Sequence, residues 1–146
     1  MITNAYRHAL DAALAGRPLE PLWVAETDKI SHRPYTTGFY FGQPGESYDK
    51  ATYSSDASVA AVVEECSDNA WATLTMRNKI TPGDALELLL PEGAPIPFTA
   101  GELFDEDGQS LAETRLVMMR YRMQLPVPAP ALSIVRKLKA PEDRPD

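Results

Sequence analysis

The chain has 146 residues, which suits one ordinary domain with appendages and is long enough to bury a hydrophobic core. Its formal net charge of -7 argues against binding nucleic acid over the whole surface, because neutralised phosphates supply most of that affinity, although a local basic face stays open. No apolar run approaches the roughly 18 residues that span a bilayer, and the N-terminus lacks a basic region followed by an apolar one. We therefore expect a soluble, cytoplasmic protein with no membrane partner.

The single cysteine limits the redox and metal chemistry of the chain. Cys66 cannot form an intrachain disulfide, and it cannot supply the thiolates of an iron-sulfur cluster. The sequence also shows no metal-ligand spacing and no Ser/His/Asp arrangement. We expect no metal site, no cofactor and no catalytic residue in this segment.

Residues 3–15 are predicted to form a helix. Thr3 or Asn4 can cap it, alanine is frequent, and Gly16 followed by Pro18 ends it. The next stretch, residues 17–29, holds two prolines and is predicted to be an extended connector. The helix carries an apolar stripe that either packs on the chain's own β domain or remains an exposed, self-associating surface; its members are Tyr6, Ala9, Leu10, Ala13 and Leu14.

An aromatic run broken by glycines follows His32, over residues 35–42. One interpretation gives His32 a proton-transfer or ligand role and makes the tyrosines a stacking surface for bases. The other is a loop whose rings pack on the β domain, with Gly38 and Gly42 present for their backbone angles. The only other histidine, His8, lies on the predicted helix and offers no catalytic partner.

From residue 47 onward the pattern is typical of antiparallel β structure. Residues 58–65 form a strand that turns back at 67–69 into a second strand over 70–80. Cys66 ends the first strand, where it serves either as a small buried hydrophobe or as a reactive thiol.

Residues 73–91 are predicted to be two paired strands joined by one defined turn. The turn is Thr81-Pro82-Gly83-Asp84, in which proline suits the second position of a type II turn and glycine accepts the positive φ of the third. Alternation then predicts strands over 95–104, 116–125 and 131–138, with an acidic hairpin tip at 105–108. Val117, Met119, Tyr121, Met123 and Leu125 are expected in the core.

These strands predict an all-β fold, an antiparallel β-barrel with one N-terminal α-helix and an extended connector. We divide the chain into the helix and connector at 1–30, the barrel at 31–139 and a disordered tail at 140–146.

Alternation also predicts one candidate binding face. Trp71, Arg77 and Lys79 fall on the outward face of one strand, and Arg120 and Arg122 fall on that of another. If the strands are neighbours, the four cations form a positive face with Trp71 as a stacking platform for RNA. The alternative is an ordinary solubilising surface in which Glu87 pairs across strands with one of these cations.

Three segments resemble the peptidase U32 family: the first its C-terminal barrel domain, the second the segment that joins its two domains, and the third the end of its catalytic barrel. They are Arg77-Asn78-Lys79 with Gly83-Asp84, Leu86-Glu87 and Pro91; the segment 31–42; and the segment 5–11. Ile80 departs from the phenylalanine that is usual there. The resemblance assigns the family motif to His32, Arg33, Thr36, Thr37, Gly38, Phe39, Tyr40, Arg77, Asn78, Lys79, Gly83, Asp84 and Glu87.

The resemblance implies a function that composition does not. Full-length members place a catalytic TIM barrel with several cysteines ahead of this region, and some act in hydroxylating bases of transfer or ribosomal RNA. We therefore expect a noncatalytic accessory domain that docks on a catalytic U32 barrel, in the same or a separate chain, and helps hold a tRNA, rRNA or peptide substrate. Residues 1–30 would be the remnant of that junction. The alternative is a stand-alone small hydrolase or peptidase that uses Cys66 or His32.

Overall fold

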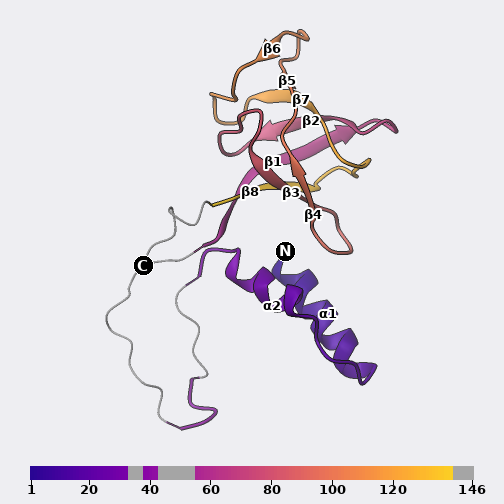
Figure 1. Ribbon diagram of the computed structural model, residues 1–146, viewed down its shortest axis with the longest axis vertical. Helices are drawn as coiled ribbons and strands as arrows, with labels where there is room; N and C mark the ends of the chain where they lie inside the picture. The colour runs from indigo at the N-terminus through magenta and orange to yellow at the C-terminus, as the bar shows by residue number, and fades with distance from the viewer. Residues whose placement is uncertain (33–37, 43–54, 140–146) are drawn as a thin grey trace. The chain divides into compact units, whose positions relative to one another are not determined.

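The computed structural model describes residues 1–32, 38–42 and 55–139. The chain divides into two compact units, which are drawn together in Figure 1. One unit comprises Ile2–Asp56 with Lys139–Asp146, and the other comprises Met1 with Ala57–Leu138. The first contains the helices and the second contains all the strands of the described residues.

The helical unit contains α1 (Ile2–Leu14) and α2 (Pro21–Asp28). The first helix ends as predicted, and Gly16 follows it with φ +62°. The extended connector predicted over 17–29 is wrong, because most of it is α2. Pro21 stands in the first turn of α2, where a residue without an N–H costs no hydrogen bond.

A ring stack joins the two helices. His8 of α1 lies on Trp23 of α2, with ring centroids 3.7 Å apart and planes within 7° of parallel. Trp23 is buried, whereas Tyr6, Leu10 and Leu14 of α1 are exposed. Both interpretations of the apolar stripe stay predictions.

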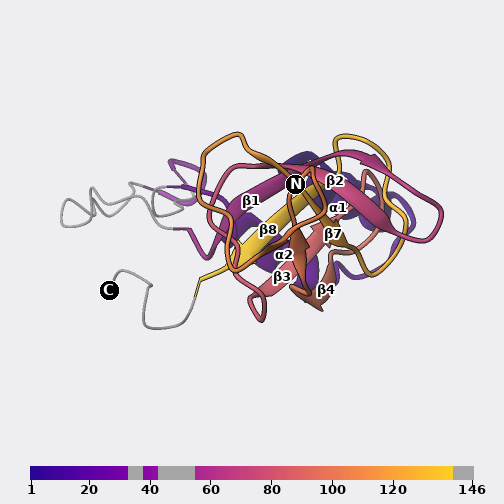
Figure 2. The same ribbon diagram turned by 90° about the horizontal axis from the view of Figure 1, so that it is seen from above.

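The second unit is one sheet of eight antiparallel strands that curves into a half-barrel, as the predicted fold class requires. Its order is β4-β3-β8-β1-β2-β7-β5-β6, and Figure 2 shows the β1, β8, β3 and β4 part side by side. The strands are β1 (Ala57–Cys66), β2 (Trp71–Met76), β3 (Ala85–Leu89), β4 (Ile96–Thr99), β5 (Leu103–Phe104), β6 (Ser110–Leu111), β7 (Arg120–Gln124) and β8 (Ile134–Leu138).

The predicted hairpin between β2 and β3 is wrong. β2 pairs with β1 and β7, whereas β3 pairs with β8 and β4. After β2 the chain follows β1 instead of turning back: the N–H groups of Arg77 and Asn78 both donate to the carbonyl of Ala60, and the Asn78 amide donates to the carbonyl of Val59 at 2.7 Å. The residues up to Asp84 then carry the chain to the other half of the sheet.

Two predicted strands are shorter than their alternation suggested. Residues 116–119 form a turn, so Val117 is 73% exposed and not in the core. Met118 has φ +68°, which breaks the extended conformation before β7 begins. The stretch 95–104 is two strands: β4 pairs with β3, and Ala100 continues that pairing to Gly83 and Asp84, whereas β5 pairs with β6 and β7.

The core fills the inner side of the half-barrel with small side chains from β1 and larger ones from the other strands. Ala60, Ala61 and Val63 of β1 face Leu74 of β2 and Val135 of β8, all fully buried. The small residues of β1 leave room for their larger neighbours at normal packing density.

One ion pair is buried in the sheet. Glu87 of β3 and Arg136 of β8 are cross-strand partners, and Nε and Nη2 of Arg136 each lie 2.6 Å from the same oxygen of Glu87. The predicted pairing of Glu87 with a cation of the outward face is therefore wrong. Loss of one member of such a pair generally costs about 3–5 kcal/mol, because the other charge stays buried without compensation.

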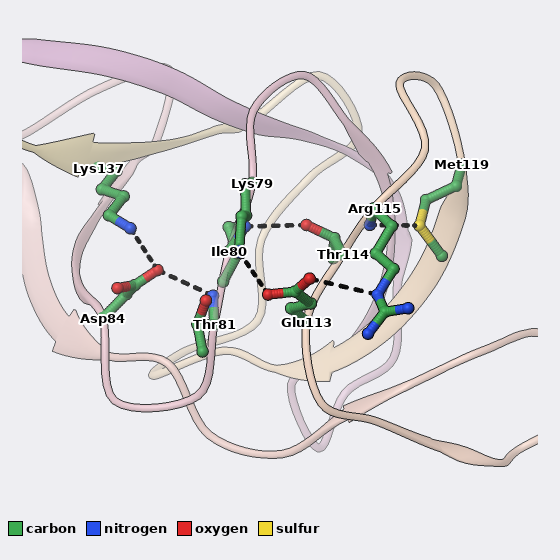
Figure 3. A network of polar contacts seen from close by, with 9 residues as sticks. All are labelled: Lys79, Ile80, Thr81, Asp84, Glu113, Thr114, Arg115, Met119 and Lys137. Atoms are coloured by element: carbon green, nitrogen blue, oxygen red, sulfur yellow. Dashed lines mark hydrogen bonds and ion pairs between the residues drawn. The ribbon is translucent and has the colours of Figure 1, made fainter.

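The turn at residues 81–84 has the predicted geometry. Gly83 has φ +95°, and the Asp84 N–H donates to the Thr81 carbonyl at 3.0 Å. The Asp84 carboxylate also accepts from the Thr81 N–H at 2.8 Å and from Lys137 Nζ at 2.6 Å (Figure 3). The turn is thus tied to β8 as well as to β3.

Replacement of Gly83 by Val should lower the free energy of unfolding by about 1–3 kcal/mol, because a β-branched residue is strained at positive φ. No atom lies within 4 Å of a Cβ built there, so strain is the only cost. The matched control is Gly101→Val, since Gly101 also has open space but no positive φ. Equal denaturant midpoints for the two variants would contradict the turn assignment.

Candidate nucleic-acid interface

The sheet places Trp71, Arg120 and Arg122 on one surface. β2 and β7 are neighbours, with Thr73 opposite Arg122 and Thr75 opposite Arg120. Side chains alternate along a strand, so the residues between these outward positions, such as Leu74 and Tyr121, face the core. We call this outward surface of β2 and β7 the β2–β7 face.

Arg122 packs on the Trp71 ring. Its guanidinium carbon lies 5.8 Å from the ring centroid, within the range of a cation–π interaction. Phe104, which pairs with Arg122 from β5, meets Trp71 edge-on with centroids 5.7 Å apart and an interplanar angle of 61°. Arg122 is exposed, and within the described ranges no carboxylate forms an ion pair with it.

Two hollows open on the β2–β7 face, and Trp71 and Arg122 line both. The smaller, of about 240 Å³, is completed by Phe104 and Gly108. The larger, of about 500 Å³, is lined in addition by Glu65, Cys66, Ser67, Thr73, Glu106 and Arg120. One hollow is therefore mainly aromatic and the other is mainly polar.

Arg120 is held by two carboxylates. Its Nε and Nη2 each lie 2.8 Å from Glu64, and its Nη1 lies 3.0 Å from Glu106. A β-bulge between Val63 and Glu65 shifts the register of β1, and Glu64 reaches across β2 to Arg120. The Thr75 hydroxyl donates to Glu64 and lowers its pKa; partial burial opposes this shift, and the positive charge of Arg120 adds to it.

Arg77 and Lys79 follow β2, which ends at Met76, and neither of them lines the two hollows. The Arg77 guanidinium contacts the sulfur of Met118. Lys79 pairs with Glu113, which also binds Arg115 at 3.2 Å and whose pKa is lowered chiefly by the hydrogen bond from Lys79 (Figure 3). Of the four predicted cations, the two arginines of β7 therefore line the hollows, and a role of Arg77 and Lys79 in binding stays a prediction.

Most motif positions of the strand region bind other parts of the sheet. The Asn78 amide donates to a carbonyl of β1, and the carboxylates of Asp84 and Glu87 accept from Lys137 and Arg136 of β8. Beside the motif, Ile80 exchanges hydrogen bonds with the buried Thr114 (Figure 3). These contacts stabilise the segment that connects β2 to β3. None of these residues lines either hollow.

The remaining predicted positions lie in the helical unit or beyond the described ranges. His32 Nε2 lies 3.8 Å from the carboxylate of Asp28. Gly38 has φ +55°, and Phe39 and Tyr40 are largely exposed. Arg33, Thr36 and Thr37 fall outside the described residues. A catalytic role for His32 or for Cys66, which is half-buried at the end of β1, stays a prediction.

Sequence reasoning missed Phe104, Glu64 and Glu106 at this site. Phe104 lies far from Trp71 in sequence. Alternation places Glu64 outward, without showing that Arg120 of β7 lies within its reach. Among the residues that the structure describes, no group of three or more His, Cys, Asp or Glu could hold a metal ion. None of the helices described is long and apolar enough to cross a membrane.

The fold and the site define an antiparallel half-barrel domain with an exposed aromatic and cationic face. Residues 55–136 match the peptidase family U32 C-terminal domain, and residues 1–50 match peptidase family U32. The chain belongs to peptidase family U32. The crystal structure of the C-terminal domain of a Geobacillus thermoleovorans protein described as a U32 peptidase is similar, with a TM-score of 0.53 and 26% identity over 56% of this chain and 92% of that one.

Two curated relatives carry names that concern transfer RNA. The chain is 28% identical to tRNA hydroxylation protein P1 of Bacillus subtilis over 85% of its own length, and 30% identical to tRNA hydroxylation protein P of Escherichia coli over 74%. It spans 31% and 24% of those two proteins.

The pKa shift of Glu64 predicts a loss of stability in acid. Its pKa is lower in the folded chain, so its stabilisation is complete above the pKa of the unfolded state and disappears as the pH falls through the folded value. Unfolding free energy should therefore decline below about pH 4.3, the ordinary pKa of glutamate. Glu64→Gln should decline less steeply, whereas Glu92→Gln, at an exposed loop position, should follow the parent. Parallel pH profiles for parent and Glu64→Gln would contradict the assignment.

Proposed function

We propose that this chain is the accessory domain of a tRNA hydroxylation protein of the U32 family and holds the RNA substrate on the β2–β7 face. The names of the relatives support the choice of RNA over peptide. The observation that carries the proposal is the exposed Arg122 beside Trp71. Aromatic rings and arginine planes are the groups with which β domains bind single-stranded nucleic acid.

The distribution of charge supports a local interface. Repulsion from a chain of net charge -7 disfavours broad contact with phosphates, so a binding site must supply uncompensated cations of its own. Arg120 is balanced by Glu64 and Glu106, whereas Arg122 has only its aromatic neighbours among the contacts described. Arg122 is therefore the cation most available to a phosphate.

RNA binding tests the proposal directly. Removing Arg120 and Arg122 together should weaken transfer RNA binding and flatten its salt dependence by about one to two units of log K against log [salt]. Arg122→Gln alone should produce most of the effect, because the Arg120 charge is already neutralised. Filter-binding titrations from low to moderate salt give both quantities.

The control is Arg115→Gln, which removes one positive charge outside both hollows and should leave the slope unchanged. Absence of transfer RNA affinity in low salt for the parent chain, or the parent slope in the double variant, would reject RNA holding. A protein-docking role would then be the better account of the domain.

The catalytic partner in this proposal is a U32 barrel, in the same or a separate chain. The match of residues 1–50 to peptidase family U32 supports it, because those residues include α1. The exposed Tyr6, Leu10 and Leu14 of α1 give that barrel an apolar contact surface.

Binding of the chain to the part of the Bacillus subtilis relative that the chain does not cover should therefore weaken about tenfold or more in Leu10→Gln/Leu14→Gln, because apolar contact area is lost. Arg7→Gln on the same helix is the control, since it removes an exposed charge, paired with Asp11, away from the stripe. Calorimetric titration gives the affinities, and sedimentation of the chain alone shows whether the stripe instead joins two copies. Equal affinity for all variants would contradict docking through α1.

A further inference from the structure

We infer that the two hollows of the β2–β7 face form one subsite for a single unpaired RNA nucleotide, with its base against Trp71 and Phe104 and its phosphate on Arg122. This inference rests on the proposed function and adds the form of RNA that is recognised. An RNA-holding domain without this subsite would contact phosphates alone and would bind duplex and single-stranded RNA with similar affinity.

The shape of the face supports one nucleotide divided between the hollows. Trp71 and Arg122 line both hollows, so a ligand that contacts these two side chains touches both hollows. The smaller hollow offers ring surfaces from Trp71 and Phe104, and at Gly108 no side chain fills it. In the larger hollow the hydroxyls of Ser67 and Thr73 already donate within the chain, so their oxygens can accept from a ribose hydroxyl, and Arg122 suits a phosphate.

The charges of the larger hollow limit the number of phosphates. Arg120 is paired with Glu64 and Glu106, and Glu65 also lines the hollow. Arg122 is therefore the guanidinium available to a phosphate, and the carboxylates of Glu65 and Glu106 disfavour a second phosphate. A surface that followed a continuous backbone would instead carry a row of free cations.

The aromatic contacts require the base to be outside a helix. Stacking on Trp71 or on the plane of Arg122 needs an exposed base face, and in a duplex the neighbouring bases cover it. Arg122 is already positioned by its contact with Trp71 and by its place opposite Thr73 in the ladder. Its planar group can therefore stack on a base face or bind a phosphate without losing much side-chain freedom.

The test compares a labelled single-stranded oligoribonucleotide with a blunt RNA duplex containing the same sequence, by fluorescence anisotropy with the full chain. The parent should bind the single strand about tenfold or more tightly than the duplex. Trp71→Ala should weaken single-strand binding about tenfold, because stacking on the ring is lost, whereas Trp71→Phe should keep most of it. Trp23→Phe in the helical unit is the matched control and should behave as the parent.

Arg122 variants separate charge from shape. Arg122→Gln should reduce the salt slope by about 0.7, the contribution of one phosphate contact in a single strand. Arg122→Lys should keep the slope and still bind more weakly, because the planar group is gone. Thermal melting of each variant shows whether it is folded. If Trp71→Ala is unfolded, the comparison of Trp71→Phe with the parent still measures the role of the ring.

The outcomes distinguish the two proposals. If the parent binds transfer RNA but prefers the duplex, or if Trp71→Ala binds single strands as the parent does, the nucleotide subsite is wrong and RNA holding stands. If the parent binds no RNA in low salt, both fail, and binding of an unstructured peptide to the same face would assign it to a protein ligand.

Discussion

The pairing of β1 with two partners is the constraint on which the sheet depends. β1 hydrogen-bonds to β2 on one edge and to β8 on the other, and so joins the β4-β3-β8 part to the β2-β7-β5-β6 part. Its alanines allow both neighbours to pack closely, and its bulge brings Glu64 to Arg120. The same strand therefore builds the core and sets the charge of the outer face.

Local features of this fold could be predicted from the sequence, whereas strand partners could not. The turn at Gly83 and the hairpin of β1 with β2 depend on neighbouring residues, and both were predicted. The pairing of β2 with β7 depends on side chains far apart in the chain, and alternation gives the face of a strand but not its neighbour. Trp71 and Arg122 were therefore assigned to a face correctly, while the positions of Phe104 and Glu64 needed the structure.

The family motif and the candidate site turn out to be different sets of residues. Asn78, Asp84 and Glu87 bind β1 and β8, so they stabilise the connection between the two parts of the sheet. The candidate site lies on the opposite part, at the β2–β7 face, where the identifying segments contribute nothing. The resemblance thus identifies the domain, and the geometry alone selects the surface.

The central claim is that RNA contacts the β2–β7 face, and amide chemical-shift mapping tests it most directly. Titration of the isotope-labelled chain with an unpaired oligoribonucleotide should shift the amides of β2 and β7 and the indole N–H of Trp71. The indole of Trp23, buried in the helical unit, should stay in place. Shifts confined to α1 or to β3 and β4, with the Trp71 indole unchanged at saturation, would contradict the account.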